Sequence, residues 1–350
     1  MTNALSQIPA GSPAPDEGSL EQKETAGLSQ GQIVRKRFFR HKGAMISLVV
    51  LVAILLLATT SIGWGIIPGW YHWNYFEQPD VMNINGGPDL MVWPFSSRFH
   101  WGLHPFGQDE LGVDLFAETM RGIQQTTVVI VVMGILSTAI GVLLGALSGY
   151  YRGWVDSVLM RFTDLMLTLP IILITAVLGY VFGVRGIWPV AFALGLLAWT
   201  GLARLVRGEF LALREREFVD AAKVAGASDA RIIFKHILPN SVGVIVVNVT
   251  LLMAGGILLE AALSFLGFGI QFPDVSLGSL ISNYATSFGT KPWLFLWPGV
   301  SIIVIVLCIN FIGDGLRDAF DPRQKRIPKQ KDLRQSPSAA AANAATVTDG

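Results

Sequence analysis

The hydrophobic positions of this chain gather in long runs that carry no charged side chain. Six windows of at least 18 residues lack Asp, Glu, Lys and Arg: Gly43–Phe76, Gly122–Tyr151, Leu165–Val184, Gly186–Ala203, His236–Leu259 and Pro292–Gly313. A helix that crosses a bilayer needs about 20 apolar residues. The run Met45–Ala58 is apolar around its whole circumference, whereas a helix of a soluble protein normally keeps a polar stripe. The pattern predicts an all-α membrane protein with six transmembrane helices, near residues 44–67, 125–149, 158–182, 187–206, 241–263 and 295–316.

The segments around these spans predict the domain organisation. Residues 1–33 are rich in Ser, Gly, Pro and Gln and are expected to be a disordered cytoplasmic tail, and residues 322–350 a second such tail. Residues 34–321 then form one membrane domain. It includes an aromatic external loop over residues 68–124 and a cytoplasmic loop over residues 207–240. The aromatic rings indicate either anchoring at the membrane interface or a surface over the pore mouth that meets substrate or a delivery protein.

Glycine recurs every four residues in the second predicted span, at Gly141, Gly145 and Gly149. Small residues at this spacing lie on one helix face and let a second membrane helix approach closely. We therefore expect this face to be a helix–helix contact, which says little about activity.

Composition agrees with the membrane prediction and excludes several other classes of protein. Of the 350 residues, 52% are hydrophobic and only 15% are charged, whereas a soluble domain carries about 25% charged residues. The formal net charge of +1 lacks the basic excess of a nucleic-acid-binding protein. A single cysteine, Cys308, excludes an internal disulfide framework.

The basic residues predict the topology. With the N-terminus inside, 22 of the 26 lysine and arginine residues lie on the cytoplasmic side of the predicted spans. The exceptions are Arg98, Arg121, Arg185 and Lys291. This asymmetry follows the positive-inside rule, so both termini and the loop between the fourth and fifth spans are predicted to be cytoplasmic.

The sequence contains no recognisable enzyme motif. No lysine follows a glycine, so the P-loop pattern GxxxxGK[ST] cannot occur, and the patterns HExxH and GxSxG are also missing. His100 and His104 are four residues apart, but Gly102 and Pro105 disfavour the regular helix that would bring both to one metal ion. We expect no catalytic residue, metal ligand or cofactor in this chain, which makes an intramembrane enzyme a poorly supported alternative.

Arg161, Asp164 and Glu260 are the charged residues within the predicted spans that need an explanation. Arg161 and Asp164 are spaced i, i+3 on the third span and are expected to neutralise each other on one helix face. Glu260 follows a long charge-free run near the outer end of the fifth span. An intramembrane acid indicates either a polar pathway or a contact between helices. A secondary transporter driven by protons through Glu260 and Asp164 is therefore one alternative function.

The loop between the fourth and fifth spans predicts a helix–turn–helix elbow on the cytoplasmic surface. A first short helix is expected over about residues 214–225 and ends at Gly226, because glycine tolerates a left-handed cap. Ser228 or Asp229 is expected to cap a second helix, which leads to Pro239 at the start of the fifth span. Such an elbow could transmit the motion of a partner to the spans. An ordinary amphipathic surface loop is the alternative.

The elbow resembles the EAA signature of permease subunits of bacterial ABC importers, E-A-A-x3-G-x9-I-x-L-P. Here it reads Asp220-Ala221-Ala222, then Gly226, then Leu238-Pro239, at the family's spacing, with Asp220 in place of Glu and His236 in place of the first Ile. Other stretches resemble the "C" type subunit of the dipeptide/oligopeptide branch. They are His104–Asp114, Gly153–Asp156, Met160–Arg161, Ala203–Gly208, Leu263–Gly267 and Gly313–Ala319, with Val113 in place of the branch's usual Arg.

The resemblance implies a type I ABC importer permease fold and an importer of di- or oligopeptides in the bacterial inner membrane. A homologous second permease subunit would complete the pathway, two cytoplasmic ATP-binding subunits would bind ATP and Mg²⁺, and an extracellular binding protein would deliver substrate. The same assembly importing another solute, such as nickel or a sugar, is the alternative. The residues that the resemblance assigns to ATPase coupling are Val219, Asp220, Ala221, Ala222, Lys223 and Gly226.

Overall fold

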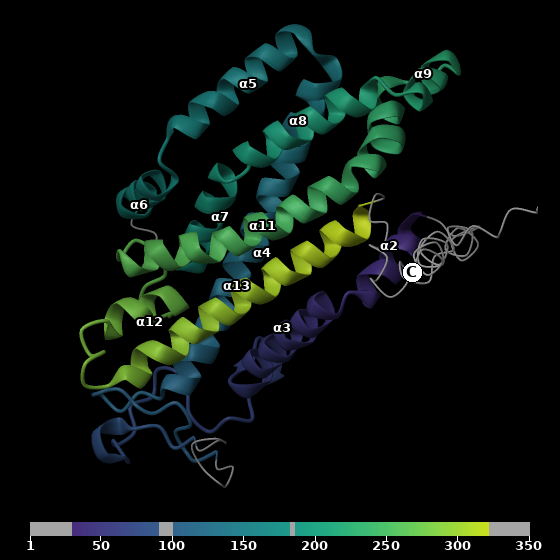
Figure 1. Ribbon diagram of the computed structural model, residues 1–350. Coiled ribbons are helices and arrows are strands. Elements are labelled where there is room, and N and C mark those ends of the chain that lie inside the picture. Colours follow the sequence, from purple (N-terminus) through teal and green to yellow (C-terminus); the bar gives the residue numbers. More distant parts are fainter. Residues whose placement is uncertain (1–29, 91–100, 183–185, 322–350) are drawn as a thin grey trace, which may run out of the picture.

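The computed structural model describes residues 30–90, 101–182 and 186–321, and this part of the chain is a bundle of long helices (Figure 1). The helices are α2 (Gln30–Arg40), α3 (Lys42–Ser61), α4 (Leu115–Tyr151), α5 (Gly153–Thr168), α6 (Ile171–Phe182), α7 (Ile187–Leu197), α8 (Thr200–Arg214), α9 (Glu217–Val224), α10 (Asp229–Arg231), α11 (Leu238–Phe265), α12 (Leu277–Tyr284) and α13 (Pro292–Phe320). Smaller elements are the strands β1 (Gly63–Trp64) and β2 (Ile67–Pro68), a 3-10 turn η1 (Ile84–Gly86) and a π-helical turn η2 (Ile232–Ile237).

The prediction of six membrane crossings is confirmed, although one crossing is broken. Five helical stretches of the described chain are long and apolar enough to span a bilayer, and the pair α5 and α6 passes the same test together. These two helices meet at an angle of 78°, whereas the sequence predicted one helix over residues 158–182. Pro170 explains the break, because the residue before a proline is driven out of the helical region. Leu169 accordingly has an extended backbone, with φ −79° and ψ 121°.

The first span ends earlier than predicted. Helix α3 stops at Ser61, and the expected continuation to residue 67 instead forms a two-stranded antiparallel hairpin, in which Gly63 pairs with Pro68. Gly63 has a φ of +79°, a conformation that glycine adopts at little cost and that a helix cannot contain. The apolar character of this segment therefore does not extend the helix.

The second span begins earlier than predicted, at Leu115 rather than near residue 125. Glu118 and Arg121 lie in its first turns, so the charge-free run from which the span was predicted begins only at Gly122. Both side chains have partners: Tyr284 donates to Glu118 at 2.8 Å, and Arg121 forms an ion pair with Asp274 at 2.6 Å.

The glycines of α4 pack against α8, as their spacing predicted. A Cβ atom added at Gly145 would lie 2.5 Å from the carbonyl oxygen of Ala203, and one at Gly149 would lie 2.6 Å from Cβ of Phe210. A Cβ atom at Gly141 would be less crowded, at 3.1 Å from Cβ of Leu202. We call this contact between α4 and α8 the glycine seam.

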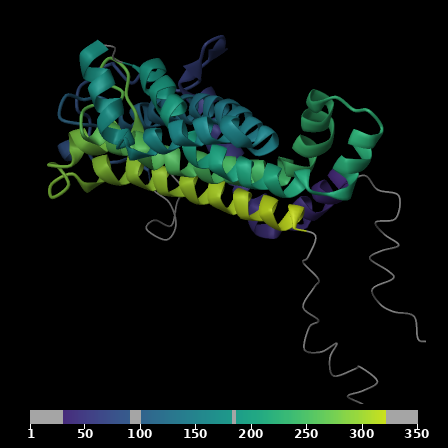
Figure 2. The ribbon, with the colours of Figure 1, turned by 90° about the horizontal axis from the view of Figure 1, so that it is seen from above.

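The basic segments gather at one end of the bundle. In Figure 1 the elbow helix α9, the N-terminal helix α2 and the last turns of α13 all lie toward this end. Figure 2 shows the elbow rising from the end of the bundle. This arrangement agrees with the predicted topology, in which these segments share one side of the membrane, and their cytoplasmic placement stays a prediction. The predicted tails fall largely outside the described residues.

Candidate functional site

The elbow forms, with its first helix shorter than predicted. Arg214 still belongs to α8, and α9 begins only at Glu217. The predicted stop at Gly226 is confirmed: this residue has a φ of +78°, and its N–H donates to the carbonyl of Lys223 at 2.9 Å. The N–H of the next residue, Ala227, donates to the carbonyl of Ala222 at 3.0 Å. These two bonds are those of a Schellman motif.

The second leg of the elbow is a π-helical turn that leads directly into α11. Ser228 occupies the predicted cap position, but its hydroxyl bonds to no helix N–H of the described chain. The carboxylate of Asp229 instead accepts a hydrogen bond from the Tyr150 hydroxyl at 2.7 Å. Pro239 then opens the fifth span as predicted. A proline ring crowds the carbonyl four residues earlier, and the wider π turn over Ile232–Ile237 accommodates it.

The inner face of α9 is anchored on the bundle. Val219 is fully buried and packs in one cluster with Phe210 of α8 and with Ile232 and Ile233 of the π turn. Ala222 is partly buried against the same cluster. The isoleucines of the π turn therefore point inward, and Val219 holds α9 against α8 and the π turn.

The outer face of α9 is open and carries charged side chains beside the small Ala221. Asp220 and Lys223 form an ion pair across one turn at 3.2 Å, and Val224 is 91% exposed. A hollow of about 500 Å³ lies beside the start of the helix, lined by residues Glu215–Phe218. Of the six residues that the resemblance assigns to ATPase coupling, four are exposed: Asp220, Ala221, Lys223 and Gly226.

The end of α4 contacts the chain on both sides of α9. Tyr150 bonds to Asp229 of the second leg, as described above, and its ring lies 5.5 Å from the guanidinium carbon of Arg214. Arg214, at the end of α8, also donates to the Tyr150 carbonyl. Arg152 pairs with Glu215, in the turn before α9, at 2.6 Å. A displacement of the elbow would therefore reach α4 as well as α8 and α11.

The predicted pairing of Arg161 with Asp164 is wrong. Asp164 forms its ion pair with Arg204 of α8, and Arg161 is exposed and has no ion pair within the described ranges. The neighbouring carboxylate of α5, Asp156, makes a bidentate contact with Arg207, at 2.6 Å for both bonds. Because α8 presents two arginines to α5, its planar guanidinium groups compete successfully for both carboxylates.

Glu260 is fully buried between α11 and α4. One carboxyl oxygen accepts from the Thr126 hydroxyl at 3.1 Å, and the other accepts from the Ser264 hydroxyl at 2.7 Å. Both oxygens thus have a partner, and the contact across to Thr126 joins two spans. The sequence left two alternatives for Glu260, a polar pathway and a contact between helices. The geometry is that of a contact between helices.

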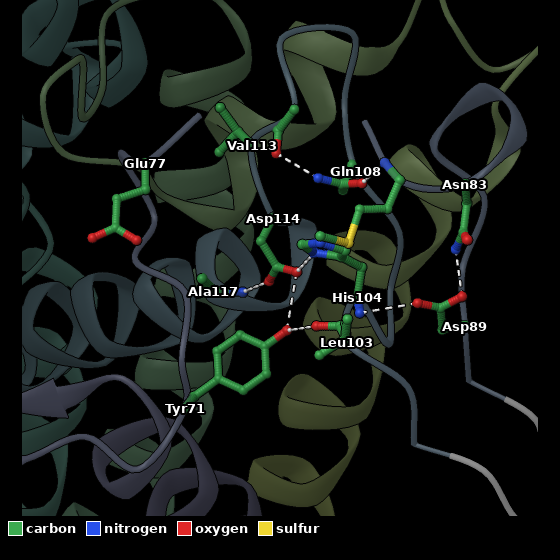
Figure 3. A network of polar contacts seen from close by, with 12 residues as sticks. Tyr71, Glu77, Asn83, Asp89, Leu103, His104, Gln108, Val113, Asp114 and Ala117 are labelled. Carbon is green, nitrogen blue, oxygen red and sulfur yellow. Dashed lines mark hydrogen bonds and ion pairs between the residues drawn. The ribbon is translucent and has the colours of Figure 1, made fainter. Parts of the chain in front are cut away.

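A buried polar network that the sequence did not predict lies at the outer end of α4 (Figure 3). His104 Nδ1 lies 2.7 Å from Asp114 Oδ2, and both side chains are fully buried. The Tyr71 hydroxyl donates to the same oxygen at 3.0 Å. The other oxygen of Asp114 accepts from the N–H of Ala117 at 2.8 Å, which caps α4. Burial and the nearby Asp114 carboxylate raise the pKa of Tyr71, so its phenol stays protonated and donates.

The segment between His104 and Asp114 folds as a compact loop that supports this network. Asp109 accepts hydrogen bonds from the N–H groups of Leu111 and Val113, both at 2.8 Å. Gln108 donates to the carbonyl of Gly112 at 2.9 Å. The His104–Asp114 motif could have indicated this arrangement, because an aspartate directly before an apolar helix is a cap signal.

Several rings of the predicted external loop pack together around one residue of α4. Tyr71, Trp101 and Phe106 surround Phe116 of α4, with ring centroids 4.7, 5.4 and 5.0 Å away. Phe106 also stacks on Trp297 of α13 at 4.0 Å. These rings hold the loop on the bundle. Other residues discussed from the sequence, His100, Arg98 and Arg185 among them, lie outside the described residues.

Comparison with known proteins identifies two matching family models. Residues 141–326 match the model of the binding-protein-dependent transport system inner membrane component. Residues 29–88 match the model of the N-terminal transmembrane domain of oligopeptide transport permease C. Together the two models cover the first span, the glycine seam, the elbow and the last four spans.

Similar proteins with assigned names agree with these models. The oligopeptide transport system permease protein OppC of Haemophilus influenzae is 37% identical over 87% of this chain and 93% of its own length. A putative peptide permease protein of Brucella ovis is 41% identical over 84% of this chain and 92% of its own length. OppC of Mycobacterium bovis is 38% identical over 87% of this chain and 98% of its own length.

Among solved structures, a chain of the MetNI methionine ABC transporter in inward-facing conformations matches 57% of this chain and 95% of its own length. It is 21% identical, with a TM-score of 0.48. The family model covers more than half of the 350 residues, and the named relatives align over nearly their whole length. The chain is therefore a multi-pass membrane protein that belongs to the family of binding-protein-dependent transport system inner membrane components, the permease subunits of ABC importers.

Proposed function

We propose that this chain is the permease subunit of an ATP-driven importer of di- or oligopeptides in a bacterial inner membrane. Family membership and the names of its relatives support peptide as the substrate. The observation that carries the proposal is the elbow: an EAA-like helix whose inner face is anchored on two spans and whose outer face is open.

The proposed assembly has four kinds of partner. A homologous second permease subunit completes the pathway, and two cytoplasmic ATP-binding subunits bind ATP and Mg²⁺. An extracellular substrate-binding protein delivers the peptide. The sequence contains no P-loop, so ATP hydrolysis belongs to the partner subunits and this chain performs no chemistry itself.

In this proposal the outer face of α9 sits in a groove of one ATPase. Asp220, Ala221, Lys223 and Gly226 provide the contact, and the small side chain of Ala221 permits close approach. Val219 and Ala222 transmit the movement, because they pack against α8 and the π turn that opens α11. ATP binding then favours one arrangement of the spans, and ATP hydrolysis and release favour the other.

The test uses the whole complex in proteoliposomes and the variant Ala221→Glu. Ala221 is exposed, so this change leaves the folded core intact, whereas Ala222 is partly buried. We expect ATP-dependent uptake of a labelled tripeptide to fall at least about tenfold, since an acid in a tight groove costs more than 1.4 kcal/mol. Ala212→Glu, at an exposed position of α8, is the matched control and should retain uptake.

Three results would contradict the proposal. Full uptake in Ala221→Glu would show that α9 makes no coupling contact. Uptake by the wild type without ATP, driven instead by a proton gradient, would support the secondary-transporter alternative. Uptake of nickel ions or a sugar by the same complex, with no uptake of the labelled tripeptide, would replace peptide as the substrate.

A further inference from the structure

A pocket of about 400 Å³ opens at the outer end of the bundle, opposite the elbow. It lies between the first turns of α4, the start of α7, strand β1 and the loop after α11. Its lining includes Trp64, Arg121, Gln125, Ile187, Trp188 and Asp274. The volume suits a small-molecule site, and the mixture of apolar walls and a few converging polar groups is typical of one.

The polar groups of this pocket are only partly used. Asp274 Oδ1 accepts three hydrogen bonds: from Arg121 Nε at 3.0 Å, from Arg121 Nη2 at 2.6 Å and from Gln125 Nε2 at 2.7 Å. Asp274 Oδ2 accepts none from the described residues. Arg121 donates once more, to Gln124 Oε1 at 3.2 Å. Since a guanidinium carries five N–H groups, two of them have no acceptor within the described part of the chain.

The ion pair therefore presents an unused acceptor and unused donors side by side, with no net charge. We propose that this pocket binds the main chain of an extended peptide. A residue in an extended strand presents its own N–H and C=O on the same side, where both can bond to one partner. Asp274 Oδ2 accepts the peptide N–H, and a free N–H of Arg121 donates to the peptide C=O.

The surrounding residues suit a bound peptide of variable sequence. Trp64 and Trp188 are 41% and 55% exposed and border the ion pair with broad apolar surfaces. Recognition through main-chain bonds gives affinity without reading particular side chains. The inference rests on the proposed function and extends it, because it assigns peptide-binding groups to the permease itself.

The position of the pocket fits a site that receives the peptide first. Gln125, which holds Asp274, is followed on α4 by Thr126, which bonds to the buried Glu260. The pocket is thus joined to the interior of the bundle through one helix. It lies at the end of the molecule where the external loop packs and where the binding protein would release its peptide.

The experiment compares two substrates in the complete complex with its binding protein. One is a labelled tripeptide, and the other is the same tripeptide methylated at one peptide nitrogen, which removes one N–H. The variant Asp274→Asn keeps the shape of the side chain and can still accept from Arg121, but it replaces the free acceptor by an NH₂ donor. We expect the wild type's preference for the unmethylated peptide, measured as kcat/KM, to fall about tenfold in the variant.

The preference ratio separates the pocket from the binding protein, because the same binding protein serves both complexes. Glu110→Gln is the matched control, since it weakens another ion pair of the outer surface, with Lys291 at 3.8 Å, and should keep the wild-type ratio. An unchanged ratio in Asp274→Asn overturns the inference. Absence of ATP-dependent peptide uptake by the wild type would instead overturn the proposed function.

A second measurement applies if Asp274→Asn does not assemble. Trp188 is replaced by benzoylphenylalanine, and the complex is irradiated with the labelled tripeptide during turnover. We expect a cross-link between peptide and permease that excess unlabelled tripeptide removes. Active transport without this cross-link would overturn the inference.

Discussion

The glycine seam between α4 and α8 makes a sharp prediction for the variant Gly145→Ala. The added methyl carbon would lie 2.5 Å from the carbonyl oxygen of Ala203 and 2.8 Å from Cβ of Val206, whereas ordinary contacts begin at 3.4 Å. The nearest atom belongs to the backbone and cannot rotate away. The two helices must therefore separate by somewhat less than about 1 Å at this point.

Two opposing contributions set the change in the free energy of unfolding. Alanine is favoured over glycine in a helix by about 1 kcal/mol, and overpacking a close contact costs about 1–3 kcal/mol. Because the obstacle is a carbonyl, we expect the upper half of that range and a net loss of about 1–2 kcal/mol in the free energy of unfolding. Gly201→Ala, on α8 with nothing within 4 Å of the added carbon, is the matched control and carries only the favourable term.

The assay measures the unfolding midpoint of the purified complex in detergent and ATP-dependent peptide uptake in proteoliposomes. Gly145→Ala should have a lower midpoint than the wild type and Gly201→Ala an equal or higher one. Uptake per ATP hydrolysed should also fall in Gly145→Ala, because α8 leads directly into the elbow. A midpoint for Gly145→Ala as high as that of Gly201→Ala would show that the seam relaxes freely, and the close-packing argument would then be wrong.

Further predictions concern the polar contacts. Asp114→Ala should lower the free energy of unfolding by about 2–3 kcal/mol in denaturant titration, because it removes a helix cap and leaves the buried His104 Nδ1 without its partner, whereas the Tyr71 hydroxyl keeps the carbonyl of Leu103. Tyr71→Phe should cost about 1–2 kcal/mol, equally from about pH 6 to pH 9. The raised pKa of Tyr71 exceeds the ordinary value of 10.0, so its stabilisation is complete below that value and is lost only as the pH rises through the folded pKa. Tyr150→Phe and Asp229→Asn should each reduce uptake per ATP several-fold, and the double variant should be no worse, since the two residues share one bond. Glu260→Gln should keep ATP-driven uptake within about twofold, because an amide can still bond to both hydroxyls, whereas a proton relay would lose transport.

The spans and the elbow could be predicted because their signals are local. A charge-free apolar run reports the cost of burying charge in lipid, and a glycine cap or a helix-opening proline acts on its own backbone. Gly226 and Pro239 therefore lie where the sequence placed them. The absence of charge predicted the start of α4 too late. Glu118 and Arg121 find partners, Tyr284 and Asp274, that only the fold brings near.

Pairings between helices could not be predicted in the same way. Arg161 and Asp164 are close in sequence, and the local rule paired them, yet Asp164 bonds to Arg204, forty residues away. The choice depends on which face α5 turns toward α8, and residue spacing along α5 does not specify that face. The pocket at Arg121 and Asp274 is likewise formed by residues 153 positions apart, which no spacing in the sequence indicates.

The proposed coupling role of the elbow depends on its being anchored at several points at once. A helix of eight residues held only at its ends could tilt in a partner's groove without moving the spans, because short isolated helices are weakly stable. Val219 prevents this, since its side chain packs against α8 and the π turn before α11 together. Tyr150 adds a third attachment, to α4. A push on the outer face of α9 must then displace three spans or unpack a buried valine, and movement of the spans is the response that keeps the core intact.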